Sequence, residues 1–192
     1  LLQDIKLENQ ILPGFEHVII DEAHNLEDEA TRQFTDTVDL EFLRKSSQHL
    51  LRNTSVVSRI INKVKDLHEN TDACGELLLA QRQLKDDITV LEQQIKTAID
   101  FVFTIGQLSH SNEYRITAKE RKTDWWQQLA SQLERIQGMV MTIYNRLSHM
   151  RNRIDMFEDL DLLAKELVFN QNWYAEQHKF LETFLAEKRK HD

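Results

Sequence analysis

The residues best suited to chemistry in this sequence follow a short apolar run near the start of the chain. The segment HVIIDEAH, residues 17–24, places Asp21 and Glu22 directly after three consecutive β-branched residues. Such a run, apolar at successive positions, is typical of a strand covered on both faces, as in a parallel α/β sheet. Ligands of these sheets bind beyond the carboxyl ends of the strands. We therefore expect a strand over Phe15–Ile20 that delivers two carboxylates to a ligand-binding edge.

Two adjacent carboxylates at such an edge suit the hydrolysis of a nucleoside triphosphate. Asp21 can hold Mg²⁺ through water, because Mg²⁺ keeps several waters and accepts one or two carboxylates together with phosphate oxygens. Glu22 can orient and deprotonate an attacking water. An apolar strand followed by Asp-Glu is the Walker B arrangement of nucleotide triphosphatases. The alternative is that Asn25 and the neighbouring acids only cap a helix, and the two roles are compatible.

Composition limits the other classes of function. The 192 residues include 24 Lys plus Arg and 32 Asp plus Glu, a net charge of −8 that argues against a uniformly basic nucleic-acid face but permits a local basic stripe. Cys74 is the only cysteine, which excludes a disulfide framework or a cysteine-ligated cluster within this sequence and favours a reducing, cytoplasmic setting. No apolar run approaches about 18 residues, so we expect no membrane-spanning segment.

Helices dominate the rest of the sequence, which has only 4 Gly and 1 Pro. Asp39 is expected to cap the helix that follows it, and residues 69–75 are expected to form a loop. Besides the two long segments described next, the helices that we expect are 1–12, 26–34, 40–51, 56–69 and 159–190.

Two long segments keep apolar residues at alternating intervals of three and four, a pattern that predicts supercoiled helices. These seam residues are Leu77, Leu84, Ile88, Leu91, Ile95, Ala98, Val102 and Ile105 in the first segment, and Trp126, Leu129, Leu133, Ile136, Val140, Ile143, Leu147, Met150, Ile154 and Phe157 in the second. The link over 106–124 is long enough to reverse the chain, and the last helix is expected to pack back on the pair. The predicted fold is mainly α: an elongated helical bundle with two long antiparallel coiled-coil-like helices, plus one short strand.

Two basic stretches are candidates for nucleic-acid binding. The first comprises Arg52, Arg59, Lys63 and Lys65, and the second, YRITAKERKTDWW, places Arg115, Lys119, Arg121 and Lys122 beside aromatic residues. Cations that meet phosphates and rings that stack on bases suit single-stranded DNA. The alternative is a solvated loop, with Trp126 buried in the helical seam.

The stretch PGFEHVIIDEAHNLEDEA, preceded by LLQDI, resembles motif II of superfamily 2 helicases, specifically the DinG/XPD-like DNA helicases, and its HNLED continuation is similar to the bacterial DinG branch. In that family a large helical insertion, the arch domain, follows motif II within the first motor domain. The resemblance therefore implies that residues 1–25 are a remnant of motor domain 1 and that residues 26–192 form an arch-type helical domain.

The resemblance also implies roles for individual residues. Asp21 would coordinate Mg²⁺, Glu22 would be the general base for ATP hydrolysis, and His24 would couple the nucleotide state to the rest of the motor. The alternative for His24 is an exposed histidine at the start of a helix. The implied cofactors are Mg²⁺ and ATP, and the implied partners are single-stranded DNA and the remaining motor in a DNA-repair setting.

The sequence contains no G-x-x-x-x-G-K-[ST] phosphate loop and begins Leu-Leu rather than with Met, so we expect a segment of a longer protein that is inactive alone. In the family the phosphate loop, and the cysteines of any iron–sulfur cluster, precede the DEAH sequence, so such a cluster would lie outside this chain. The competing hypothesis is a non-catalytic coiled-coil interaction module in which DEAH is accidental. In either case the open edge of the strand at Phe15–Ile20 predicts weak self-association.

Overall fold

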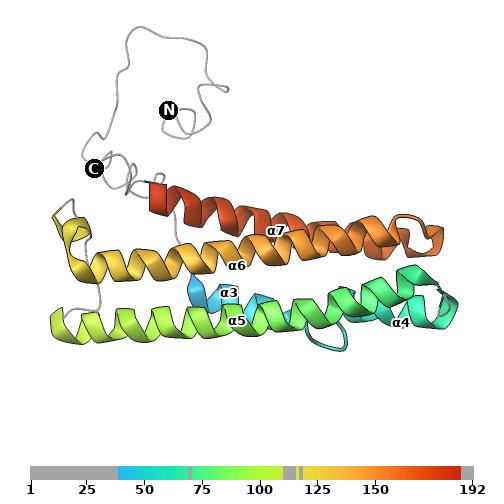
Figure 1. The fold of residues 1–192 in the computed structure, drawn as a ribbon, viewed down its shortest axis with the longest axis horizontal. Coiled ribbons are helices and arrows are strands. Elements are labelled where there is room, and N and C mark those ends of the chain that lie inside the picture. The colour runs from blue at the N-terminus through green and yellow to red at the C-terminus, as the bar shows by residue number, and fades with distance from the viewer. Residues whose placement is uncertain (1–38, 69–70, 110–115, 117–118, 187–192) are drawn as a thin grey trace, which may run out of the picture. The chain divides into compact units, whose positions relative to one another are not determined.

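The computed structural model describes residues 39–68, 71–109, 116 and 119–186. By its contacts the chain divides into two units, Leu1–Thr37 and Val38–Asp192, and the described residues all belong to the second, which we call the helical unit. The strand expected at Phe15–Ile20 and the domain boundary expected after residue 25 lie outside the described residues. The helical unit consists of five α-helices and two short 3₁₀ turns, with no strand among the described residues, so the prediction of a mainly α fold is confirmed (Figure 1).

The first two helices of the unit are short and capped by side chains. The helix α3 spans Leu40–His49, and an Asp39 carboxylate oxygen accepts a hydrogen bond of 2.8 Å from the backbone N–H of Phe42. Asp39 therefore satisfies one of the free N–H groups at the helix start, as its sequence position predicts. The helix α4 spans Val56–His68, and Ser55 accepts a 3.2 Å hydrogen bond from the backbone N–H of Ser58 in the same way.

Two long helices form the central pair. The helix α5 spans Asp72–Ser109 and α6 spans Asp124–Ile154, and they run antiparallel along each other (Figure 1). The predicted seam residues of α5 are buried as far as Ala98, and those of α6 are buried throughout the helix. The antiparallel pairing of the two heptad segments is therefore confirmed.

The seam of α5 departs from the prediction at Val102, which is 47% exposed. The groove between α3 and α5 is lined on the α5 side by residues 89–99, because α3 begins only at Leu40. Beyond Ile99 no residue of α5 lines this groove, and Val102 is the first predicted seam residue of α5 that is exposed.

The loop expected over residues 69–75 is shorter in the structure. Thr71 Oγ1 accepts a 3.2 Å hydrogen bond from the backbone N–H of Cys74, so Thr71 caps a helix that starts at Asp72. Ala73 and Cys74 are buried in the first turn of this helix. The prediction of a loop as far as Gly75 was wrong. The threonine cap stabilises the start of the helix at Asp72 more than the glycine disfavours helix at residue 75.

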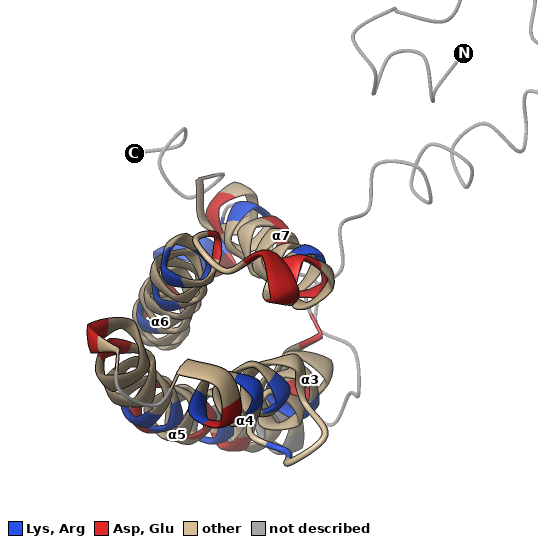
Figure 2. Ribbon diagram, turned by 90° about the vertical axis from the view of Figure 1, so that its right-hand side faces the viewer, with Lys and Arg blue, Asp and Glu red and all other residues tan. Residues whose placement is uncertain are grey.

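The last helix, α7, spans Asp161–Ala186 after a 3₁₀ turn over Glu158–Leu160. It packs along α6, and α3 and α4 pack along α5, so that an end-on view shows the helices around one shared interior (Figure 2). The buried hydrophobic residues of the described chain, except Ala73, form a single cluster that reaches all five helices. As the sequence predicts, α7 packs back on the pair, and Leu160, Leu167, Tyr174, Leu181 and Leu185 are buried.

Candidate functional site

Four of the predicted site residues lie outside the described residues. They are Asp21, Glu22 and His24, which are predicted to serve catalysis, and Arg115, which is predicted to bind DNA. The helical unit does describe the other three residues expected to bind DNA. Lys119, Arg121 and Lys122 are brought together on one turn, the 3₁₀ helix Glu120–Lys122 with the residue before it, directly ahead of α6. We call Lys119, Arg121, Lys122 and Trp125 the α6 tip.

The α6 tip is fixed by local hydrogen bonds. Thr123 Oγ1 donates to the carbonyl oxygen of Glu120 at 2.5 Å, and the Gln127 side-chain amide donates to the carbonyl oxygen of Arg121 at 2.9 Å. The backbone therefore holds the cationic side chains at a defined place at the end of the central pair. Lys119 and Lys122 are exposed there, so a phosphate backbone could reach them.

The two tryptophans of this region play different parts. Trp126 is fully buried, and the Arg121 guanidinium lies over its ring, 5.5 Å from the centroid. Trp126 is thus a core residue that cannot stack on a base, which agrees with the alternative interpretation of the sequence for this ring. Trp125 is half-buried and meets Trp126 edge-on at 6.1 Å, so its ring is the one that retains an accessible part.

The other basic stretch has a structural role in the described unit. Arg59 forms an ion pair with Glu166 of α7, and the Lys63 ammonium donates a hydrogen bond to the carbonyl oxygen of Asp159. Both contacts fasten α4 to the segment that begins α7. These two cations therefore already have partners within the bundle.

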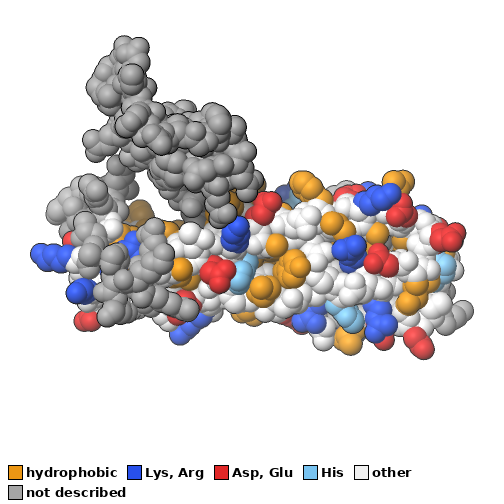
Figure 3. All heavy atoms as spheres, turned by 90° about the horizontal axis from the view of Figure 1, so that it is seen from above, with side chains coloured by type: hydrophobic (Ala, Val, Ile, Leu, Met, Phe, Trp, Pro, Cys, Tyr) orange, Lys and Arg blue, Asp and Glu red, His pale blue; other side chains and the backbone are white. Residues whose placement is uncertain are grey.

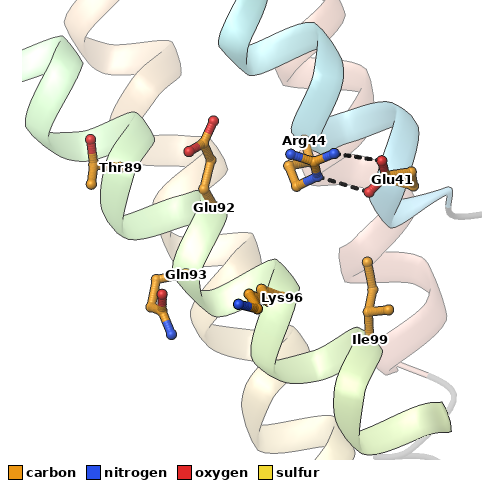
Figure 4. A pocket seen from close by; sticks show the side chains of 7 residues that line it. All are labelled: Glu41, Arg44, Thr89, Glu92, Gln93, Lys96 and Ile99. Carbon is orange, nitrogen blue, oxygen red and sulfur yellow. Dashed lines mark hydrogen bonds and ion pairs between the residues drawn. The ribbon is translucent and has the colours of Figure 1, made fainter.

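A groove between α3 and α5 was not suggested by the sequence. It has a volume of about 360 Å³ and is lined by Glu41, Arg44, Thr89, Glu92, Gln93, Lys96 and Ile99 (Figure 4). Within it, Arg44 donates two hydrogen bonds, of 2.6 and 2.8 Å, to the carboxylate of Glu41. The Arg44 guanidinium lowers the pKa of Glu41 from 4.5 to about 2, and the carboxylate in turn raises the pKa of Arg44.

The groove holds both positive and negative side chains. Arg44 already pairs with Glu41, and Lys96 has Glu92 on the same wall (Figure 4). A second hollow, between α5 and α6, is similar, because its arginines Arg146 and Arg153 pair with Asp87 and Glu76. The arginines of both hollows are therefore already paired with carboxylates.

A buried polar contact ties α7 to α3. The Tyr174 hydroxyl donates a 2.9 Å hydrogen bond to Ser47 Oγ, which donates one of 2.9 Å to the carbonyl oxygen of Leu43. Burial raises the pKa of Tyr174, so its hydroxyl keeps its proton at all ordinary pH values and remains a donor. This contact therefore joins the first and the last helix of the described unit.

Two other kinds of feature are absent from the part of the chain that the structure describes. Across residues 39–68, 71–109 and 119–186, no group of three or more His, Cys, Asp and Glu side chains is placed to hold a metal ion. None of the helices that the structure describes is both long enough and apolar enough to cross a membrane.

Comparison with known proteins adds no family to this picture. No protein-family model matches the chain, and no curated protein or solved structure matches it either. Its function is therefore inferred from its own residues.

Proposed function

We propose that this chain is part of an ATP-dependent DNA helicase of the DinG/XPD-like kind. In this proposal Asp21 holds Mg²⁺ of Mg-ATP through water, Glu22 is the general base that activates the attacking water, and His24 couples the nucleotide state to the rest of the motor. The observation that carries the proposal is an order along the chain: an apolar run ending in Asp-Glu-Ala-His is followed by a mainly α unit from α3 to α7.

The helical unit would then act as the arch that helps to enclose translocating single-stranded DNA. Its central pair is long, since the 38 residues of α5 correspond to about 55 Å of helix. Its core is continuous, so the unit can project from a motor domain as a stiff element. The α6 tip supplies cations and one partly accessible ring at the end of that element.

Binding of a fluorescent oligothymidylate to the full chain, followed by anisotropy, tests the role of the α6 tip. Lys122→Glu should weaken binding and flatten its salt dependence, because each cation that contacts a phosphate adds to the slope. The matched control is Lys179→Glu, which makes the same charge change at an exposed site in the middle of α7. Equal effects of the two variants would show that only the net charge of the chain affects binding. The α6 tip would then not be a specific DNA-binding site.

A second candidate function is a non-catalytic helical interaction module in which the DEAH sequence is accidental. It is favoured by the paired arginines of both hollows and by large hydrophobic side chains exposed on α7. The gene distinguishes the two candidates. A phosphate-binding loop encoded within about 300 residues upstream supports the helicase, whereas a reading frame that starts near Leu1 supports the interaction module.

A further inference from the structure

One face of α7 carries a row of large hydrophobic side chains that are exposed or only partly buried. Leu162, Phe169, Trp173 and Phe180 follow one another at intervals of seven, four and seven residues. At 3.6 residues per turn these spacings place all four within about 20° of one line along the helix. Leu162 is 80% exposed and Phe169 is 75% exposed. Figure 3 looks onto the molecule from the α7 side and shows hydrophobic side chains among charged ones on this surface.

Phe42 of α3 widens this row. Its ring meets Trp173 edge-on at 6.0 Å and is itself 55% exposed. We call Leu162, Phe169, Trp173, Phe180 and Phe42 the outer apolar row. Since an aromatic side chain has a surface of about 150–250 Å², the exposed part of the row amounts to about 500 Å² per chain. A patch of that size usually marks an interaction site.

The charges beside the row indicate what kind of partner it can take. The helix α7 carries Asp161, Glu166, Glu176 and Glu182 but only two lysines, Lys165 and Lys179. An acidic helix repels nucleic acid and anionic membrane surfaces, which attract basic helices. The partner is therefore a protein surface with an apolar face of its own.

The spacing of the row makes it complementary to itself. Leu162 and Phe180 lie nine residues either side of Gln171, and Phe169 and Trp173 lie two residues either side of it. A two-fold axis near Gln171 would thus pair each apolar residue with another one, as an interface between identical surfaces requires. We propose that α7 is the self-association surface of this chain, and that it pairs antiparallel with α7 of a second copy about that axis.

The charges and the area are consistent with such a pair. Glu166 would face Glu176 of the partner subunit, and Arg59, which already forms an ion pair with Glu166, supplies positive charge between them. Two copies would bury about 1,000 Å² of apolar surface in total, near the lower limit of a specific interface, so the dimer forms only at high concentration. This surface differs from the edge of the predicted strand at Phe15–Ile20, and variants of α7 distinguish the two.

Sedimentation velocity of the full chain over a range of concentrations tests the proposal. The wild type should dimerise, and Phe169→Glu should weaken the association at least about tenfold, because it buries a charge in the contact. The matched control is Leu79→Glu, which makes a similar change at an exposed position of α5 and should leave the association unchanged. A wild type that is monomeric throughout, or a Phe169→Glu variant that dimerises equally, would overturn the proposal.

Cysteine cross-linking tests the antiparallel register separately. In a Cys74→Ser background, Asn172→Cys places two thiols about 3 Å apart along the helix axis, whereas Lys165→Cys places them about 18 Å apart. A short bismaleimide should therefore link the Asn172→Cys chains and leave the Lys165→Cys chains unlinked. Equal cross-linking of both variants would indicate a parallel pair, and failure of the first variant would remove the two-fold axis near Gln171; either result overturns the register.

Discussion

Among single residues, Ser47 and Tyr174 make a buried contact whose two partners should respond differently to substitution. The two residues are 127 positions apart, and both are fully buried at the junction of α3 and α7. Ser47 donates to Leu43 and accepts from Tyr174, so the two possible deletions are not equivalent. Removing the serine leaves a buried hydroxyl without an acceptor, whereas removing the tyrosine hydroxyl leaves Ser47 with its backbone partner.

We therefore predict that Ser47→Ala destabilises the chain more than Tyr174→Phe. An unsatisfied buried donor costs about 1–3 kcal/mol, whereas loss of an ordinary hydrogen bond costs about 1 kcal/mol. Urea denaturation followed by circular dichroism at 222 nm measures both free energies of unfolding. If Tyr174→Phe proves the more damaging variant, the tyrosine hydroxyl has another role than donating to Ser47.

The sequence predicted some of these residues and could not predict others. Asp39 was expected to cap α3 because capping is local and depends on the few residues that follow. Tyr174 was expected only as a member of an apolar stripe. Its pairing with Ser47 depends on how α3 and α7 cross, which no spacing within either helix determines.

Among the helices, the central pair allows a test of whether the heptad pattern identifies the buried residues. Ile136 is fully buried at the middle of α6, and Ile95 and Leu91 of α5 are equally buried. Ile136→Asp would put an unpaired charge into this core, which costs several kcal/mol against a total stability of about 5–15 kcal/mol. We predict a large fall in Tm, or loss of the cooperative transition, in thermal unfolding followed at 222 nm.

The control for this variant is Asn145→Asp, an exposed position of the same helix that should shift Tm little. The neighbouring residue Gln137 is not a suitable control, although its heptad position suggests that it faces away from α5. Its side-chain nitrogen lies 3.4 Å from a ring nitrogen of His178, because α7 covers a second face of α6. If Ile136→Asp and Asn145→Asp behave alike, the 3,4 spacing does not identify the buried face.

The helix boundaries show how far such patterns predict structure. Long apolar repeats identified α5, α6 and α7, because burial of one face over many turns outweighs local preferences. The repeat failed at Val102, which lies beyond the part of α5 that lines the groove with α3, and at the start of α5, where a threonine cap decides the boundary. Both differences arise from neighbours and caps, which the repeat does not encode.

For the whole molecule, we predict that the purified chain does not hydrolyse ATP. Phosphoryl transfer depends on positioning the phosphates, and the sequence provides one carboxylate pair without a phosphate-binding loop. A malachite-green assay with single-stranded DNA present measures the activity. Turnover above background that disappears in Glu22→Gln would contradict this prediction, because it would show that the chain contains a complete site.

The central claim is that Asp21 and Glu22 serve ATP hydrolysis in the protein to which the helical unit belongs. Hydrolysis by the intact protein tests this claim most directly. ATP binding and DNA-stimulated hydrolysis are measured for the wild type and for Glu22→Gln in the full-length helicase that we propose. The variant should keep ATP binding, since Asp21 still coordinates Mg²⁺. Its rate of hydrolysis should fall by about 10²–10⁴-fold, because the general base is removed. A Glu22→Gln protein that hydrolyses ATP at nearly the wild-type rate would contradict the claim.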